Sequence, residues 1–258
     1  MLFYKRIVPL NKDKHRSLRL GEAGGVAEFA AETHYVPLAA SEFHQACRHY
    51  PVLFAGGDDG GPISLLGLRE EENLFVSEDG SWAEGKYVPA FVRRYPFVLA
   101  QGDEHAGFTV CFDEEYGGFN DREGHALFTE EGEHAPFLER VIQFLQTYRS
   151  EMLATDRFVE TLNSLDLLVD QDLRVQTPDG ASFSLKGFRV VDEERLRKLA
   201  DGKVGELVRE GYMGWIYAHL ISLNNLSDLP RWIPENASRE APRPSGHQAT
   251  TDTEPAQS

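Results

Sequence analysis

The chain has 258 residues, of which 41% are hydrophobic and 11% aromatic, enough for a packed core in one large domain or two small ones. Its formal net charge of -16 disfavours nucleic acid and anionic membranes as partners, because such a surface repels other polyanions. No stretch holds the roughly 20 consecutive apolar residues of a membrane-spanning helix, and the N-terminus lacks the pattern of a secretory signal. We therefore expect a cytoplasmic protein without membrane insertion, with surface association by a route other than Sec export left open.

The first half of the chain is predicted to be rich in strands, because short apolar runs alternate with polar or glycine-rich breaks. Residues 2–10 and 17–20 are expected to form a strand pair near the start. Ser41 is expected to cap a helix that reaches Tyr50 and ends before Pro51. Residues 52–55 and 63–68 are expected to be two strands joined by a loose hairpin loop, and the remaining expected strands are residues 73–76, 97–100 and 108–112.

Helices dominate the second half, after Gly118. Pro136 suits the first turn of an amphipathic helix through about Ser150, and a second helical run follows around residues 158–165. A hairpin of residues 172–176 and 182–190 is predicted, joined by a turn at residues 178–180. Three more helices are expected: one capped by Asp192, one ending at Gly211 and one at 212–224.

This irregular mixture predicts an α+β fold, with a strand-rich N-terminal half and with helices and one β-hairpin in the C-terminal half. No internal linker divides residues 1–234, so we expect a single globular domain. Residues 235–258 lack apolar periodicity and cannot bury enough surface to offset their ordering entropy, so a disordered tail is predicted. Nothing in the sequence indicates the oligomeric state.

Several familiar catalytic and metal motifs are missing or incomplete. Residues 80–87 approach a phosphate-binding loop, but Tyr87 replaces the hydroxyl that ligates magnesium, and Pro89 limits the following helix. The nine histidines lack the local spacing of zinc or iron sites, residues 58–59 lack the ligand pattern of an EF-hand, and there is no Gly-x-Ser-x-Gly nucleophile elbow. We expect no metal and no cofactor, although a metal site assembled from distant residues stays open.

The two cysteines, Cys47 and Cys111, lie far apart in the sequence and outside any redox motif. Two free thiols are expected, with a single disulfide between them as the alternative.

Two spots are candidates for ligand binding. Arg93 and Arg94 lie among Tyr87, Tyr95 and other aromatic residues, an arrangement that suits a carboxylate or phosphate ligand; the alternative is that they pair with the chain's own carboxylates. Pro89 and Pro96 restrict the segment between them to a helix of at most about two turns, which we expect to be first a packing hub.

His219 is the second spot, an ionisable side chain on an apolar helix. It is interpreted either as a ligand-binding or catalytic residue or as a core histidine that is hydrogen-bonded to the backbone.

Residues 87–97, residues 216–223 and the segment from Asn73 to Trp82 together resemble the bacterial SapC family, over about residues 1–233. The resemblance implies a link to surface layers and supplies no catalytic residue. The name is shared with a peptide-transporter permease, which needs membrane spans that are not seen in this sequence.

We therefore favour a non-enzymatic binding or accessory protein that recognises a small anionic ligand or a protein partner. Its basis is the cluster of arginines and aromatic residues together with the missing catalytic motifs. A surface-layer component is the first alternative, supported by the resemblance. An enzyme or enzyme subunit with a dispersed site near His219 is the second.

Overall fold

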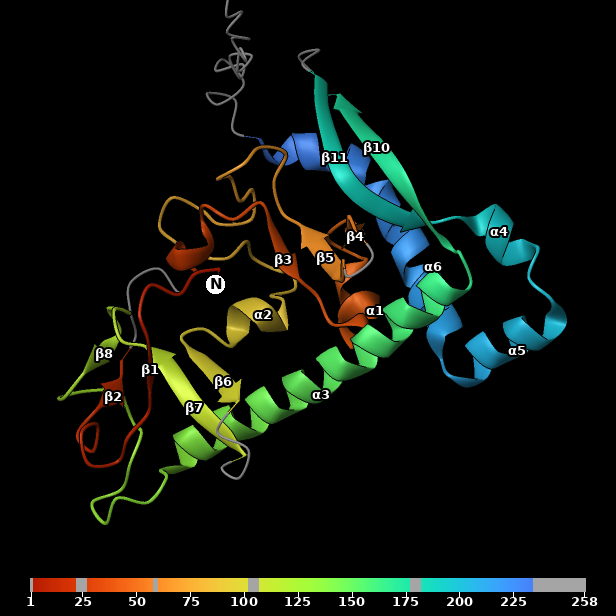
Figure 1. Cartoon of the computed structure of the whole chain (residues 1–258). Helices are drawn as coiled ribbons and strands as arrows, with labels where there is room; N and C mark the ends of the chain where they lie inside the picture. Colours follow the sequence, from red (N-terminus) through yellow and green to blue (C-terminus); the bar gives the residue numbers. More distant parts are fainter. Residues whose placement is uncertain (1, 22–26, 58–59, 102–106, 177–181, 234–258) are drawn as a thin grey trace, which may run out of the picture.

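The computed structural model describes residues 2–21, 27–57, 60–101, 107–176 and 182–233 (Figure 1). The expected tail at 235–258, the aspartate pair at 58–59 and the turn at 178–180 lie outside these ranges. Within them, strands dominate the first half, and helices with one strand pair make up most of the second, so the predicted α+β class is confirmed.

A five-stranded antiparallel sheet joins the two halves of the chain. Its strand order is β10-β11-β4-β5-β3. The strands are β3 (Tyr35–Pro37), β4 (Val52–Ala55), β5 (Pro62–Leu65), β10 (Leu168–Gln176) and β11 (Ser182–Val191). The predicted pairing of β4 with β5 and of β10 with β11 is confirmed.

Two three-stranded sheets lie at the other end of the molecule (Figure 1). One has the order β1-β7-β6 and the other β8-β2-β9. Their strands are β1 (Ile7–Pro9), β2 (Arg19–Leu20), β6 (Phe97–Gln101), β7 (Phe108–Asp113), β8 (Phe119–Asn120) and β9 (His125–Ala126).

The expected pairing of the first two strands with each other is wrong. Val8 of β1 lies opposite Phe112 of β7, whereas β2 pairs with β8 and β9. The physical reason is a distant partner: the carboxylate of Asp113 accepts hydrogen bonds from the backbone N–H groups of Lys5 and Arg6, both at 2.9 Å. These contacts hold the N-terminal segment against β7.

Helix α3 (Pro136–Ser164) is one continuous helix of 29 residues, so the predicted division after about Ser150 is wrong. The region of the expected break contains no glycine or proline. Thr155, which faces the core there, donates to the carbonyl of Glu151 and accepts from the backbone N–H of Ala40, both at 2.8 Å. The helix therefore keeps its hydrogen bonds where the apolar pattern weakens.

The remaining helices are short. They are α1 (Phe43–Ala46), α2 (Ala90–Arg93), α4 (Glu193–Arg197), α5 (Asp201–Arg209) and α6 (Tyr212–Ser222), with 3-10 turns at η1 (Glu28–Ala30), η2 (Ala40–Glu42), η3 (Leu223–Ser227) and η4 (Leu229–Trp232). The predicted helix at 41–50 is shortened and begins earlier. Its first turn is η2, which follows Ala39, and the Glu42 carboxylate accepts from the Ala39 N–H at 3.0 Å, so Ser41 is not the cap.

Residues 73–76 do not form the expected strand; one bridge joins Val76 to Trp82. The Asn73 side chain explains the difference, because it donates to the carbonyl of Ala30 at 2.9 Å and accepts from the N–H of Phe75 at 3.0 Å. A side chain that bonds the nearby backbone in this way favours a turn over a strand.

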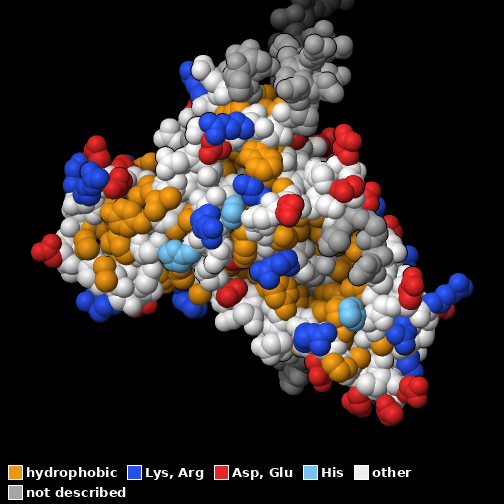
Figure 2. All heavy atoms as spheres, turned by 180° about the vertical axis from the view of Figure 1, so that it is seen from behind, with side chains coloured by type: hydrophobic (Ala, Val, Ile, Leu, Met, Phe, Trp, Pro, Cys, Tyr) orange, Lys and Arg blue, Asp and Glu red, His pale blue; other side chains and the backbone are white. Residues whose placement is uncertain are grey.

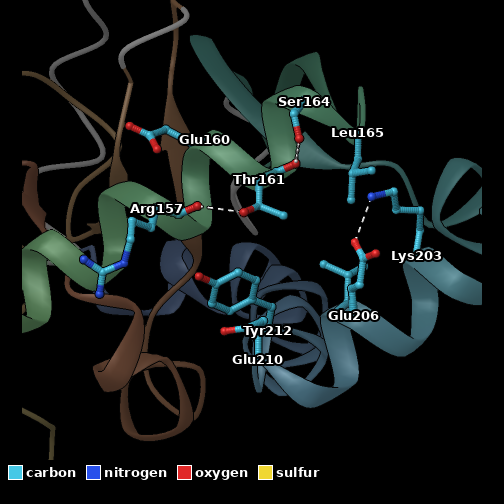
Figure 3. A pocket seen from close by; sticks show the side chains of 10 residues that line it. Arg157, Glu160, Thr161, Ser164, Leu165, Lys203, Glu206, Glu210 and Tyr212 are labelled. Atoms are coloured by element: carbon cyan, nitrogen blue, oxygen red, sulfur yellow. Dashed lines mark hydrogen bonds and ion pairs between the residues drawn. The ribbon is translucent and has the colours of Figure 1, made fainter.

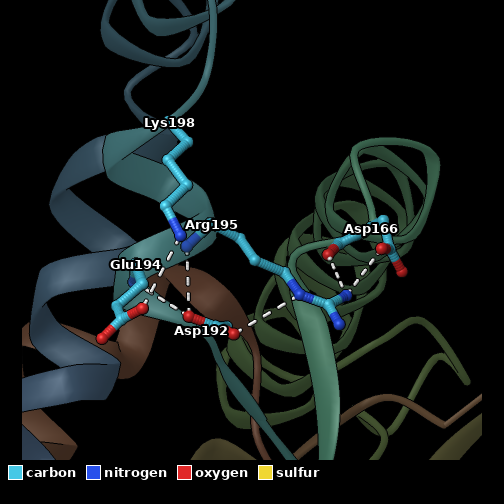
Figure 4. Close-up of polar contacts among 5 residues, drawn as sticks. All are labelled: Asp166, Asp192, Glu194, Arg195 and Lys198. Atoms are coloured by element: carbon cyan, nitrogen blue, oxygen red, sulfur yellow. Dashed lines mark hydrogen bonds and ion pairs between the residues drawn. The ribbon is translucent and has the colours of Figure 1, made fainter.

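Asp192 caps α4 as predicted. Its side chain accepts from the backbone N–H groups of Glu194 and Arg195 (Figure 4). Arg195 also reaches across to Asp166, with 2.6 Å between the guanidinium and the carboxylate. This contact links the start of α4 to the turn that follows α3.

Two apolar cores lie along α3, which contributes to both. Leu138 and Leu145 pack in the smaller core with Phe97 and Phe112, whereas Tyr148, Phe158 and Leu162 pack in the larger core beneath the five-stranded sheet. The helix thereby connects the two groups of strands (Figure 1). Cys47 and Cys111 are free thiols, as expected.

A candidate anion-binding groove

Helix α2 is held in place at its first turn by a buried carboxylate. Glu42, 5% exposed, accepts hydrogen bonds from the Ala90 N–H and the Tyr87 hydroxyl, both at 2.7 Å. Burial raises the pKa of Glu42, while these hydrogen bonds and the charge of Arg93 act in the opposite direction. Phe91 and Val92 point into the larger core. The segment is thus a packing hub, and its last turn carries the two arginines.

Arg93 lies on the exposed side of this hub. Its Nε donates to the carbonyl of Val88 at 3.0 Å, and its Nη2 donates to the Tyr87 hydroxyl at 3.2 Å. The guanidinium lies 5.2 Å from the ring centre of Phe144 on α3. Neutral partners and an aromatic ring therefore fix the orientation of Arg93 without neutralising its charge.

Arg94 is half-buried among aromatic rings. Its guanidinium lies 4.1 Å from the ring centre of Phe91, 5.3 Å from that of Tyr148 and 5.8 Å from that of Tyr4. Within the described chain, Nε of Arg94 is buried and has no hydrogen-bond partner. Burial raises the pKa of Tyr4 to about 12, although Arg94 lowers it, so the neighbouring phenol stays neutral beside the guanidinium.

A groove of about 320 Å³ runs between the end of α2, the start of β6 and the first turns of α3. Arg140 of α3 joins Arg93 and Arg94 in its wall, and its guanidinium lies 6.0 Å from the ring centre of Phe137. The other lining residues are Leu20, Tyr95, Pro96, Phe97, Phe137, Val141 and Phe144. The groove therefore combines three guanidinium groups with a mainly apolar surface.

No carboxylate lines this groove. Among the residues that the structure describes, Arg93, Arg94 and Arg140 make no ion pair with Asp or Glu, so the alternative of internal pairing is not what is observed. Although the chain as a whole is strongly acidic, these three arginines form a local group of positive charges with no carboxylate in the groove wall. Figure 2 shows the molecule from behind the view of Figure 1, with basic and acidic side chains interspersed with hydrophobic ones.

Tyr87 and Tyr95, the two tyrosines among the predicted ligand-binding residues, differ in their relation to the groove. The Tyr95 ring lines the groove, but its hydroxyl donates to Asp113 at 3.0 Å, and the ring stacks on Phe29 with 4.1 Å between centres. Tyr87 lies beside Arg93, between that residue and Glu42, and does not line the groove. Burial and the adjacent carboxylates raise the pKa of both phenols, so both are hydrogen-bond donors at neutral pH.

His219 belongs to another part of the molecule. Its ring is fully buried in α6, where Nδ1 lies 2.7 Å from the carbonyl oxygen of Val52 and Nε2 accepts from the N–H of Val191 at 3.1 Å. These partners assign the proton to Nδ1. Burial lowers the pKa of His219 to about 4. This is the geometry of the core histidine considered from the sequence, and it does not bring His219 to the groove.

A larger hollow, of about 640 Å³, lies between the end of α3 and helices α5 and α6 (Figure 3). Its charges are mixed, and Lys203 pairs with Glu206 at 2.8 Å. The hydroxyls of Thr161 and Ser164 donate to carbonyls of their own helix. Because its charges are of both signs and Lys203, Thr161 and Ser164 already have partners, this hollow is a weaker candidate for an anion site than the groove.

The described residues contain no group of three or more His, Cys, Asp or Glu side chains placed to hold a metal ion. In the same ranges, no helix is long and apolar enough to cross a membrane.

Comparison with known families supplies the wider context. The model of the SapC family matches residues 10–229. The chain belongs to the SapC family. The matched region of this SapC-family chain includes every residue that lines the groove. No curated protein and no solved structure matches it.

Sequence reasoning missed Arg140 and Glu42. Arg140 is exposed on α3, three residues after Phe137 and four before Phe144, so it lies beside these two half-buried rings. An arginine at helical spacing between two aromatic residues was the available signal. Glu42 follows Ala39 by three residues, the spacing from which a carboxylate reaches back to a free backbone N–H.

Proposed function

We propose that this protein binds a small organic anion in the groove formed by Arg93, Arg94 and Arg140. The observation that carries the proposal is that three guanidinium groups line one groove with no carboxylate among its lining residues. Like charges held close together repel one another, and an anion between them relieves that repulsion. The role is binding, in keeping with a non-enzymatic protein.

The arginines are also held ready for a ligand. Arg93 is fixed by Val88 and Tyr87, and Arg94 is packed against Phe91 and Tyr148. Side chains ordered before binding lose less conformational entropy when the ligand arrives, which favours affinity. The planar guanidinium fork matches the two oxygens of a carboxylate or phosphate.

Isothermal titration calorimetry with a panel of carboxylates and phosphates tests this proposal. We expect at least one anion to bind, and Arg94→Gln to weaken it by roughly tenfold or more, since a hydrogen bond to a charged group contributes about 1.5–3 kcal/mol. Arg93→Gln and Arg140→Gln should weaken it as well. The matched control is Arg157→Gln. Arg157 is an exposed arginine on α3, like Arg140, but it lies outside the groove.

The proposal is wrong if the panel gives no binding, or if a bound anion is held with unchanged affinity by all three groove variants.

A further inference from the structure

The side chains that line the groove between the arginines restrict which class of anion it can bind. Besides the guanidinium groups, the groove offers the apolar side chains of Leu20, Pro96, Phe97, Phe137, Val141 and Phe144. Its remaining polar side chain is Tyr95, whose hydroxyl already donates to Asp113 at 3.0 Å. No free hydroxyl or amide side chain is present among the lining residues to bind the hydroxyls of a sugar phosphate or a nucleotide.

At the cationic end of the groove, Arg94 is the residue best suited to anchor the ligand. Arg93 already uses Nε and Nη2 for Val88 and Tyr87. The Nε of Arg94 has no partner among the described residues, although it is buried. Because that N–H is closed off from solvent, a ligand oxygen would bond the other N–H groups of the Arg94 guanidinium, which belongs to the groove wall and makes no ion pair among the described residues.

The apolar wall is preorganised too. Phe137 stacks on His125, with 4.7 Å between ring centres and 5° between ring planes. Phe144 lies under the guanidinium of Arg93 and packs against both cores. The groove volume of about 320 Å³ corresponds to about ten water volumes. That is room for a carboxylate and a short apolar body.

We infer that the ligand is an amphipathic carboxylate of roughly ten non-hydrogen atoms in all, with its head at Arg94 and Arg93 and its apolar body, ring or chain, along Phe137 and Phe144. This inference rests on the proposed anion binding and goes further by assigning the apolar wall to the ligand. Each methylene removed from water adds to affinity, so the body should strengthen binding beyond the head group alone.

Calorimetric titration of the full chain with octanoate, acetate and inorganic phosphate separates these claims. We expect octanoate to bind at least tenfold more tightly than acetate or phosphate. Phe144→Ala should reduce the affinity for octanoate at least fivefold, and by a larger factor than it reduces that for acetate, which has no long apolar body to lose its contact. The control is Phe108→Ala, which removes an aromatic ring that is 43% exposed and lies outside the groove.

Because Phe144 also contacts the cores, Arg140→Glu serves as a second variant. Arg140 is exposed, and the new carboxylate would repel the head group without emptying a core position. We expect it to weaken octanoate binding at least tenfold, with thermal unfolding unchanged.

Equal affinity for octanoate, acetate and phosphate would overturn the amphipathic inference and leave anion binding intact. Octanoate binding that neither Phe144→Ala nor Arg140→Glu affects would also overturn it. If none of the three ligands binds, and neither does any anion of the wider panel, the proposed function itself fails.

Discussion

The Glu42 carboxylate accepts a hydrogen bond from the Tyr87 hydroxyl at 2.7 Å, and the same hydroxyl accepts one from Arg93 at 3.2 Å. Glu42 also accepts from the backbone of Ala39 and Ala90. One buried carboxylate therefore joins the start of η2, the segment before α2 and the edge of the groove.

Replacing Glu42 with alanine should destabilise the protein. Glu42→Ala leaves two backbone N–H groups and one hydroxyl without their acceptor, and we expect the free energy of unfolding to fall by about 2–4 kcal/mol. Urea unfolding followed by circular dichroism measures the change. Glu160→Ala, at an exposed position of α3, is the control and should change stability by less than about 0.5 kcal/mol. A Glu42 variant as stable as this control would contradict the assignment.

His219 should make stability depend on pH. Its pKa falls from the ordinary 6.5 to about 4 because the folded protein buries the ring. The unfolded chain therefore takes up a proton at higher pH than the folded one, so stability is retained above pH 6.5 and lost as pH falls towards 4. Between pH 7 and 4 this residue should account for a loss of about 3 kcal/mol.

Urea unfolding at several pH values tests this, with His219→Gln as the comparison. The variant should be less stable at pH 7 and should show a smaller fall in stability between pH 7 and 4 than the original protein. The exposed His44→Gln is the control and should retain the full fall. Parallel pH profiles for the original protein and His219→Gln would show that this histidine is not the source.

Asp113 should anchor the N-terminal segment. Burial alone raises the pKa of this fully buried carboxyl, but hydrogen bonds from the backbone of Lys5, Arg6 and Glu115 and from Tyr95 outweigh that effect and lower it. Asp113→Ala should lower the free energy of unfolding by about 2–4 kcal/mol. It should also speed hydrogen exchange at the amides of Lys5 and Arg6 in NMR spectra.

The exposed Asp121→Ala should leave both measurements unchanged. Unaltered exchange at Lys5 and Arg6 in Asp113→Ala would mean that another contact holds the segment.

The start of α4 allows a comparison of a helix cap with a surface ion pair. Asp192→Ala should cost about 1 kcal/mol, because two helix N–H groups lose their acceptor. Arg195→Ala should cost less than about 0.5 kcal/mol, although its distance to Asp166 is only 2.6 Å, since both side chains are exposed. Thermal unfolding of both variants, and of Asp192→Asn, which keeps the cap, measures which change destabilises the protein more. A larger loss of stability in Arg195→Ala than in Asp192→Ala would contradict this interpretation.

The parts of the fold that depend on neighbours in sequence were predictable. The β4–β5 pair, the cap at Asp192 and the short helix between Pro89 and Pro96 follow from local apolar patterns, capping residues and prolines. The pairing of β1 with β7 was not predictable in this way, because it depends on a carboxylate more than 100 residues away.

The candidate site likewise has residues that the local sequence predicts and residues that it does not. Arg93 and Arg94 were identifiable as a cationic pair among aromatic residues, but Arg140 reaches them only because α3 packs across β6 and the end of α2. His219 stood out for its ionisable ring on an apolar helix, and the fold uses that ring to bond the backbone of two strands. The local sequence was enough to identify side chains with the chemistry to bind a ligand, whereas tertiary packing determines which of them share a surface.

A crystal structure of the protein with 4-bromobenzoate, with the bromine located by anomalous scattering, tests the groove most directly. The account predicts a bromine peak against Phe137 and Phe144, with the carboxylate oxygens within hydrogen-bond distance of Arg94. A bound ligand with its bromine elsewhere on the molecule and the groove free of ligand density would contradict it.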